Sequence, residues 1–143
     1  MKKLTASKPL FALSLCVLAM LACKLGSSSP TATFKAFFEA QKKSDVAAIK
    51  KTLSKASLAL LEKAAKAQNK TLDAGITEAF AGGSKTEAMP ETRNEKTDGD
   101  NATLEVQDTD TKNWEMMYFV KEDSEWKVAL DKTMEELLKK TVK

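Results

Sequence analysis

The sequence predicts an α+β fold, with N-terminal helices packed on a curved antiparallel sheet of about three to four strands and a C-terminal helix. Up to about residue 80, apolar residues recur at spacings of three and four, the period of an α-helix. From about residue 84 they alternate with polar residues, as in a half-buried strand. The stretch Lys132–Val142 returns to helical spacing. This change of period predicts helices first and a sheet second.

The first helix is predicted to begin at Pro30, because proline suits the first helical position and Ser29 can cap the helix. Phe34, Phe37 and Phe38 lie on one face of this helix. That stripe either belongs to the core or lines a ligand cavity, which makes Phe34 and Phe38 candidate pocket residues. Core is the favoured interpretation.

Three more helices follow, each with a capping residue. We expect Ser44-Asp45 to cap a short helix, Ser54 to begin a helix that runs to about Gln68, and Thr71 to cap a last short helix ended by Gly82-Gly83. The apolar positions expected to face inward are Val46, Ile49, Leu53, Leu58, Leu61, Ala65, Leu72, Ile76, Ala79 and Phe80.

The second half predicts antiparallel strands. Thr86–Thr97 reads as a weak edge strand, or as a loop followed by a strand, because it is polar and contains Pro90. A half-buried strand with Ala102, Leu104 and Val106 on one face follows an Asp98–Asp100 turn. The last two strands are Asn113–Glu122 and Glu125–Leu130, with Asp123-Ser124 as a two-residue turn.

That turn would pair Lys121 with Trp126, Phe119 with Val128 and Met117 with Leu130. Both faces of the hairpin are then apolar, because Trp114, Met116, Tyr118 and Val120 fall on the opposite face. The second face needs a cover, either the C-terminal helix through Met134, Leu137, Leu138 and Val142 or a partner subunit. The candidate pocket or interface residues of the sheet are Trp114, Met116, Tyr118 and Trp126.

The first 22 residues are typical of a secretion signal. Lys2, Lys3 and Lys8 precede an apolar run, Pro9–Ala22, which at 14 residues is short of the roughly 20 that span a bilayer. The run ends in Met20-Leu21-Ala22-Cys23, which resembles the bacterial lipobox, although Met20 stands where leucine is usual. The resemblance implies cleavage between Ala22 and Cys23 and a lipid anchor such as palmitate on Cys23. An ordinary cleaved signal and an uncleaved anchor helix are the alternatives.

The predicted organisation is therefore a signal peptide at 1–22, a lipidated cysteine with a short tether at 23–30, and one domain at 31–143. Cys16 leaves with the signal, so the single cysteine that remains allows no intramolecular disulfide. The membrane is the expected partner, through the lipid on Cys23, and the expected location is the cell envelope. In a two-membrane bacterium, Lys24 after Cys23 predicts the outer membrane, facing the periplasm.

The charge gives no support to nucleic-acid binding. The chain has 23 Lys+Arg and 20 Asp+Glu, and three of the lysines precede Cys23, so the remainder is neutral. Residues 24–70 are basic and residues 71–131 are acidic. The basic part either faces anionic headgroups or attracts the acidic sheet, and the second interpretation is favoured.

Histidine is absent from the sequence. A Ser-His-Asp or Cys-His catalytic group and a His-ligated zinc site are thereby excluded. The acidic residues cluster in turns, and Asp98-Gly99-Asp100 alone is too little for a calcium loop. We expect no catalytic residues, no metal and no cofactor.

Two sequence phrases stand at the ends of the predicted domain, PTATFKAFFEAQKKSDVAAIKKTLS at its start and YFVKEDSEWKVAL near its end. With the order of helices, a weak strand and three antiparallel strands, they resemble the nuclear-transport-factor-2-like superfamily, a cone-shaped, cystatin-like α+β fold. The resemblance covers about Pro30–Leu130 and is strongest to the bacterial lipoprotein members of unknown function. Where the closing hairpin of the family usually has glycine, this chain has Ser124.

The resemblance does not choose a function, because that fold hosts enzymes and binding proteins alike. The favoured hypothesis is a non-catalytic lipoprotein whose domain binds a small apolar ligand or a protein partner. The second is a structural envelope protein, a homodimer through the Trp114–Val120 face. The third is an isomerase- or hydratase-like enzyme that uses a carboxylate beside Tyr118, the only tyrosine.

Overall fold

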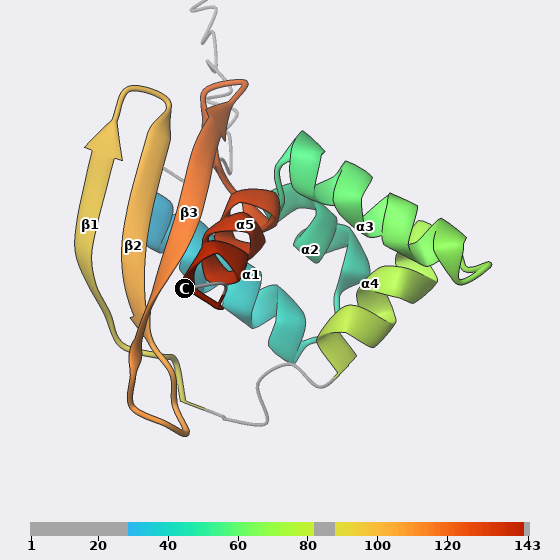
Figure 1. Ribbon diagram of the computed structural model, residues 1–143, viewed down its shortest axis with the longest axis horizontal. Coiled ribbons are helices and arrows are strands. Elements are labelled where there is room, and N and C mark those ends of the chain that lie inside the picture. The colour runs from blue at the N-terminus through green and yellow to red at the C-terminus, as the bar shows by residue number, and fades with distance from the viewer. Residues whose placement is uncertain (1–28, 82–87, 142–143) are drawn as a thin grey trace, which may run out of the picture.

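A computed structural model of the chain describes residues 29–81 and 88–141 and has the predicted α+β architecture. Four helices precede the sheet and one follows it (Figure 1). The helices are α1 (Pro30–Lys42), α2 (Val46–Thr52), α3 (Lys55–Ala67), α4 (Leu72–Ala81) and α5 (Leu130–Thr141). The strands are β1 (Thr92–Asp98), β2 (Asn101–Gln107), β3 (Trp114–Glu122) and β4 (Glu125–Val128). They form one antiparallel sheet in the order β1-β2-β3-β4, which is not closed.

The predicted caps begin the first four helices. The Ser29 hydroxyl accepts the Ala32 N–H at 3.1 Å, and the Asp45 carboxylate accepts the Ala48 N–H at 2.9 Å. The caps of the next two helices are similar: the Ser54 hydroxyl accepts the Ser57 N–H at 3.0 Å, and the Thr71 hydroxyl accepts the Ala74 N–H at 3.2 Å. Each bond satisfies a backbone donor without an intrahelical partner and contributes about 1 kcal/mol.

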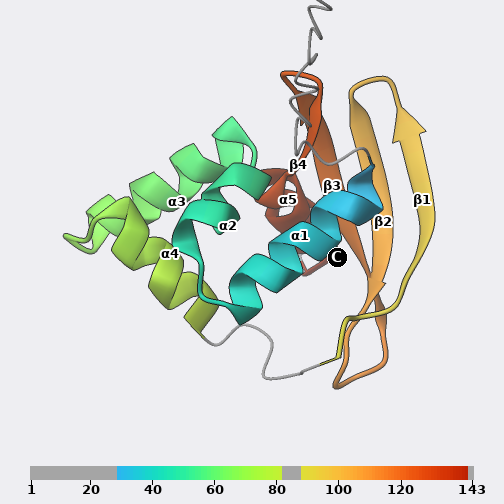
Figure 2. The same cartoon turned by 180° about the vertical axis from the view of Figure 1, so that it is seen from behind.

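The core lies between the sheet and the helices, and α1 crosses the face of the sheet that it covers (Figure 2). Phe119 and Val128 are fully buried there, and Phe37 meets Phe80 of α4 edge to face, with ring centroids 5.5 Å apart. The expectation that Ala79 faces inward is wrong, because Ala79 is exposed, whereas Ile76 on the same helix is fully buried as expected. The other buried members of the cluster are Phe34, Ala40, Ile49, Leu53, Ala102, Leu104 and Trp126.

The closing hairpin has the predicted two-residue turn. Glu122 pairs with Glu125, and the two residues between them both have positive φ, +51° for Asp123 and +68° for Ser124. Such a turn matches the right-handed twist of its strands. The predicted pairs Lys121–Trp126 and Phe119–Val128 are therefore confirmed.

The predicted pair Met117–Leu130 is wrong, because β4 ends at Val128 and Leu130 begins α5. The last hydrogen bond toward β3 is from the Ala129 N–H to the Tyr118 carbonyl, at 2.8 Å. The Leu130 N–H then donates to the hydroxyl of Ser57 at 2.8 Å, so the chain leaves the sheet toward α3.

The C-terminal helix exists as predicted, but its apolar stripe does not face inward. α5 contacts β3 and α3, and its Thr133 hydroxyl donates to the Ala129 carbonyl and accepts the Tyr118 N–H. Met134 is 52% exposed and Leu138 is 64% exposed. The helix thus lies beside β3 through its first turn, and its apolar stripe is not the cover that the sequence suggested. The alternative cover, a partner subunit, stays a prediction.

β1 is the edge strand that the sequence indicated, and it is irregular. Its pairing with β2 shifts between Arg93 and Lys96, where Asn94 has a φ of +53°. The irregularity brings the Glu95 carboxylate to the start of α1, where it accepts the Thr31 N–H at 2.9 Å and the Thr31 hydroxyl at 2.6 Å. A negative charge at a helix N-terminus is stabilising, so the bulge fixes α1 against the sheet edge.

Some predictions concern parts of the chain that lie outside the described residues: the signal peptide, Ala22 and Cys23, the Gly82-Gly83 helix end, and Val142. Among the residues that are described, no helix has the length and apolar character needed to cross a bilayer.

Candidate functional site

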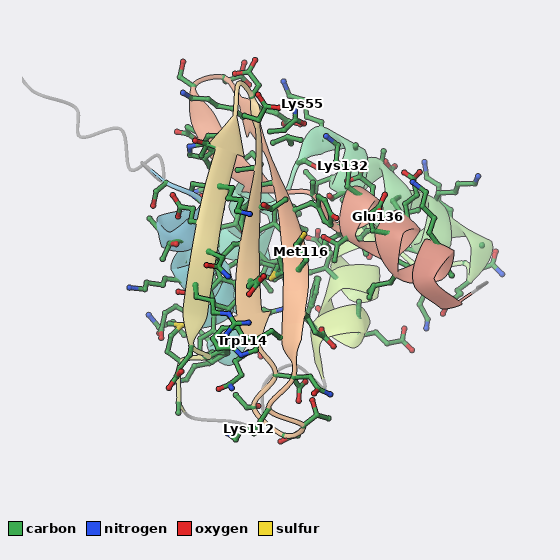
Figure 3. All side chains as sticks on the ribbon, turned by 60° about the vertical axis from the view of Figure 1, so that its left-hand side comes forward. Lys55, Lys112, Trp114, Met116, Lys132 and Glu136 are labelled. Atoms are coloured by element: carbon green, nitrogen blue, oxygen red, sulfur yellow. The ribbon has the colours of Figure 1, made fainter. Side chains whose placement is uncertain are left out.

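The sheet has a second face, opposite α1, that is only partly covered (Figure 3). Because side chains alternate along a strand, Tyr118 and its partner Thr103 point away from the buried Phe119 and Ala102. We call this surface the outer face. The side chains on it include Arg93, Lys96, Thr103, Glu105, Trp114, Met116 and Tyr118.

A cavity of about 370 Å³ lies on the outer face, between the β1–β2 hairpin and the beginning of α5. We call it the outer pocket. It combines side chains from three strands and one helix, so no single segment of the chain forms it. Its lining residues are Lys96, Thr97, Asp98, Asn101, Ala102, Thr103, Tyr118, Phe119 and Lys132.

Lys132 forms the α5 side of the outer pocket, and two contacts fix its place. Its ammonium donates to the Asn101 side-chain oxygen at 2.6 Å, which joins α5 to β2. The preceding residue, Asp131, accepts the buried Ser57 hydroxyl at 2.9 Å. Because Ser57 belongs to α3, the first turn of α5 is held from both sides.

The polar side chains of the outer pocket are largely unused by the fold. Within the described residues, the Lys96 ammonium and the Thr103 and Tyr118 hydroxyls take part in no hydrogen bond or ion pair. Lys96 and the Asp98 carboxylate, which also lines the pocket, are exposed. These groups are available to a ligand in place of water.

Next to the outer pocket, Arg93 links Glu105 and Trp114. Its Nε lies 2.6 Å from the Glu105 carboxylate, and its guanidinium lies 3.8 Å from the centroid of the Trp114 ring. The hydrogen bond from Arg93 is the main cause that lowers the pKa of Glu105 from its ordinary value, and the Asn94 amide adds to it. This cluster, Arg93–Glu105–Trp114, is ordered by its own contacts.

The predicted site residues are divided between the two faces. Tyr118 lines the outer pocket, while Trp114 and Met116 lie on the same face, Trp114 beneath Arg93 and Met116 exposed (Figure 3). Phe34 and Phe38 are buried under the other face, in agreement with the favoured core interpretation.

Trp126 is buried and also borders a second cavity, of about 460 Å³, between α1, α2 and β4. The Lys127 ammonium at that cavity already donates to the Lys51 carbonyl and to Glu125, both at 2.7 Å. It caps the end of α2, so this cavity offers fewer unused polar groups than the outer pocket.

Of the polar residues that line the outer pocket, only Tyr118 was a predicted site residue, and sequence reasoning missed the others: Lys96, Thr97, Asp98, Asn101, Thr103 and Lys132. The alternation around Ala102 and Leu104 was the signal that could have placed Asn101 and Thr103 on a polar face. Lys96 depends on the irregular β1 register, and Lys132 depends on where β4 ends, and neither feature is visible in the sequence.

Among the described residues, no group of three or more acidic or cysteine side chains is arranged to hold a metal ion. Several carboxylates instead have structural roles. Glu95 lies at the start of α1, Glu122 accepts the Lys55 N–H at the start of α3, and Asp108 accepts the backbone N–H groups of its own turn. The hydrogen bonds that Asp108 accepts, above all those from Thr111, hold the pKa of Asp108 below its ordinary value.

The helices and the open antiparallel sheet define an α+β protein with a small pocket on its outer face. The family model described as a domain of unknown function, DUF4878, matches residues 22–129, so the chain belongs to that family. The match contains all four strands and ends directly before α5. No curated protein and no solved structure gives a significant match.

Proposed function

We propose that the chain is a cell-envelope lipoprotein, anchored through Cys23, whose nuclear-transport-factor-2-like domain binds a small ligand without transforming it. The observation that carries the binding role is the outer pocket, whose Lys96, Thr103 and Tyr118 side chains make no hydrogen bond or ion pair within the described residues. Polar groups that converge on a cavity without serving the fold are a mark of ligand sites.

The anchor is supported by the sequence pattern and by the place where the domain begins. Lys2, Lys3 and Lys8, the apolar run and Ala22-Cys23 have the order of a lipoprotein signal. Ser29 already caps α1, so only residues 24–28 separate Cys23 from the folded domain. At about 3.5 Å per residue, the outer pocket would lie close to the membrane surface.

The proposed superfamily rests on the order of elements, four helices followed by four antiparallel strands, and on the closing hairpin.

The polar groups of the outer pocket favour a binding protein over an enzyme. Asp98 is exposed, and the other polar groups of the pocket are hydrogen-bond donors or amides. Because Asp98 and Tyr118 both line the outer pocket, an enzyme that uses a carboxylate beside a tyrosine is the second candidate function.

Anchoring is tested by expressing the full chain in a bacterium fed with labelled palmitate. The wild type should incorporate label and sediment with membranes, and Cys23→Ala should do neither. Cys16→Ala is the matched control, because it removes the other cysteine and should still be labelled. Equal labelling of Cys23→Ala and the wild type would refute the anchor.

Binding is tested by native mass spectrometry of the full chain released from detergent. We expect a monomer that carries a reproducible extra mass, and Thr103→Phe, which fills the outer pocket, should lose that mass. Lys112→Gln, at the other end of the sheet, should retain it. A clean dimer without extra mass would instead indicate the structural role, through the face that exposes Met116. Turnover of the retained molecule, lost in Asp98→Asn, would indicate the enzyme.

A further inference from the structure

We infer that the outer pocket receives an oxyanion, the carboxylate or phosphate group of a small ligand, between Lys96 of β1 and Lys132 of α5. This inference rests on the proposed binding function and adds the chemical class of the ligand. It follows from the balance of donors and acceptors in the pocket and from the use that the fold makes of each group.

Two lysines, Lys96 of β1 and Lys132 of α5, line the outer pocket from different elements. Each has three N–H donors, and within the described residues the only hydrogen bond of either group is the 2.6 Å bond from Lys132 to the Asn101 oxygen. Lys132 therefore keeps donors for a ligand while its position stays fixed. An oxyanion between the two ammoniums would make charge-assisted hydrogen bonds, which are the stronger kind.

The neutral groups of the outer pocket also favour an acceptor. The Asn101 oxygen is occupied by Lys132, which leaves the Asn101 amide N–H₂ as its unused group. The Thr103 and Tyr118 hydroxyls have no partner among the described residues and can donate. A ligand rich in acceptor oxygens satisfies more of these groups than an apolar or cationic ligand would.

Charge and size limit the ligand further. Asp98 is the single carboxylate of the lining, so the pocket carries two positive charges and one negative charge. A cavity of about 370 Å³ is at the lower end of the range for small-molecule sites. The arrangement fits one anionic group on a compact body and disfavours a polyanion.

The experiment is calorimetric titration of the full chain, in neutral detergent, with phenyl phosphate and with uncharged benzyl alcohol. Phenyl phosphate should bind and benzyl alcohol should bind much more weakly. Lys96→Gln and Lys132→Gln should each weaken phenyl phosphate binding about tenfold, the effect of one lost charge-assisted bond. Lys132→Arg, which keeps the charge, should recover part of the loss.

Lys112→Gln removes a lysine at the far end of the sheet and should bind phenyl phosphate as the wild type does (Figure 3). Circular dichroism of each variant confirms that it is folded. Vesicles of phosphatidylcholine with phosphatidic acid separate two sources of the group. Competition with phenyl phosphate supports an oxyanion from a lipid headgroup, and its absence supports one from a soluble ligand.

Equal binding of the two probes, or unchanged binding by both Lys96→Gln and Lys132→Gln, would overturn the inference. The proposed function is judged separately, because a neutral molecule retained in native mass spectra would preserve the binding role while excluding the oxyanion. Absence of palmitate labelling in the wild type would refute the anchor and leave the pocket chemistry as it is.

Discussion

At the scale of single residues, Gly75 shows how closely α3 and α4 approach each other. A Cβ built on Gly75 would lie 2.7 Å from the Ala65 Cβ, well inside van der Waals contact. Ala65 is itself buried and cannot move away without shifting its helix. Glycine is therefore required here by a neighbour and not by its own backbone angles.

Gly75→Ala should destabilise the protein by about 1–2 kcal/mol, because the cost of overpacking exceeds the roughly 1 kcal/mol that alanine gains in a helix. Chemical denaturation measures the change. The double variant Ala65→Gly/Gly75→Ala restores the space, so its loss should be smaller than the sum of the two single losses. Simple additivity would show that the contact is not the cause.

Arg93 controls the ionisation of Glu105 on the outer face. In Arg93→Gln the pKa of Glu105 should rise toward its ordinary value of 4.5, because the largest cause of the lowering is removed. A lowered pKa means that the ionised carboxylate adds stability above the unfolded-state value and that this is lost as pH falls through the folded-state pKa. The wild type should therefore lose more stability than Arg93→Gln on acidification below about pH 4.5.

Carbon-detected NMR titration of the Glu105 carboxyl measures this pKa directly. Arg93→Lys is the control, since it retains the positive charge beside the carboxylate and should keep much of the lowering. An unchanged Glu105 titration in Arg93→Gln would mean that Lys96 or Asn94 has the larger influence.

At the scale of elements, the β3–β4 turn is the clearest place to improve the fold. Ser124 holds a φ of +68°, where glycine has no steric cost. Ser124→Gly should stabilise the protein by about 0.5–1 kcal/mol, less the entropy that glycine adds to the unfolded chain. Thermal unfolding measures the gain. Ala88→Gly, at an exposed position outside any helix or strand, should give no gain.

The residues at which the helices begin could be predicted, because a helix start depends on nearby residues in the sequence. Ser29, Asp45 and Ser54 each cap the helix that follows, and a cap needs only residues one turn away. The end of β4 could not be predicted, because it depends on Ser57, which is more than 70 positions away in the sequence. The exposure of Met134 and Leu138 has the same origin, since the path of α5 follows from that end.

Some residues of the outer pocket can be placed from the local sequence pattern, and others only from the tertiary structure. Tyr118 was placed on the second face by alternation, which is local. Lys96 reaches the pocket only through the shifted register of β1, and Lys132 only through the position of α5. A sequence pattern predicts which face a residue occupies, but the residues that meet across elements are set by tertiary structure.

At the scale of the whole molecule, one core joins the helical half to the sheet. Phe34 and Phe37 of α1, Ile49 of α2 and Ile76 of α4 belong to the same buried cluster as Leu104 and Phe119 of the sheet. Neither half can expose its part of this cluster while the other half remains packed. The described domain should therefore unfold as one unit.

Both tryptophans, Trp114 and Trp126, are in the sheet, whereas the far-ultraviolet circular dichroism signal comes mainly from the helices. Urea unfolding followed by tryptophan fluorescence and by circular dichroism should therefore give one common midpoint. Two separate midpoints would show that the helices and the sheet are independent units, and the single-domain organisation would have to be abandoned.

The hydrogen-bonded cluster of buried Ser54 and Ser57 with half-buried Asp131 links the outer pocket to α3. Ser57 accepts the Leu130 N–H and donates to Asp131, and the next residue is the pocket lysine, Lys132. The helix that carries this cluster, α3, contributes nothing to the lining itself. A displacement of the first turn of α3 would move the first turn of α5 through these hydrogen bonds. Lys132, which forms one wall of the outer pocket, would then move as well. In the proposed binding role, affinity at the outer pocket would therefore depend on α3, which does not line the pocket.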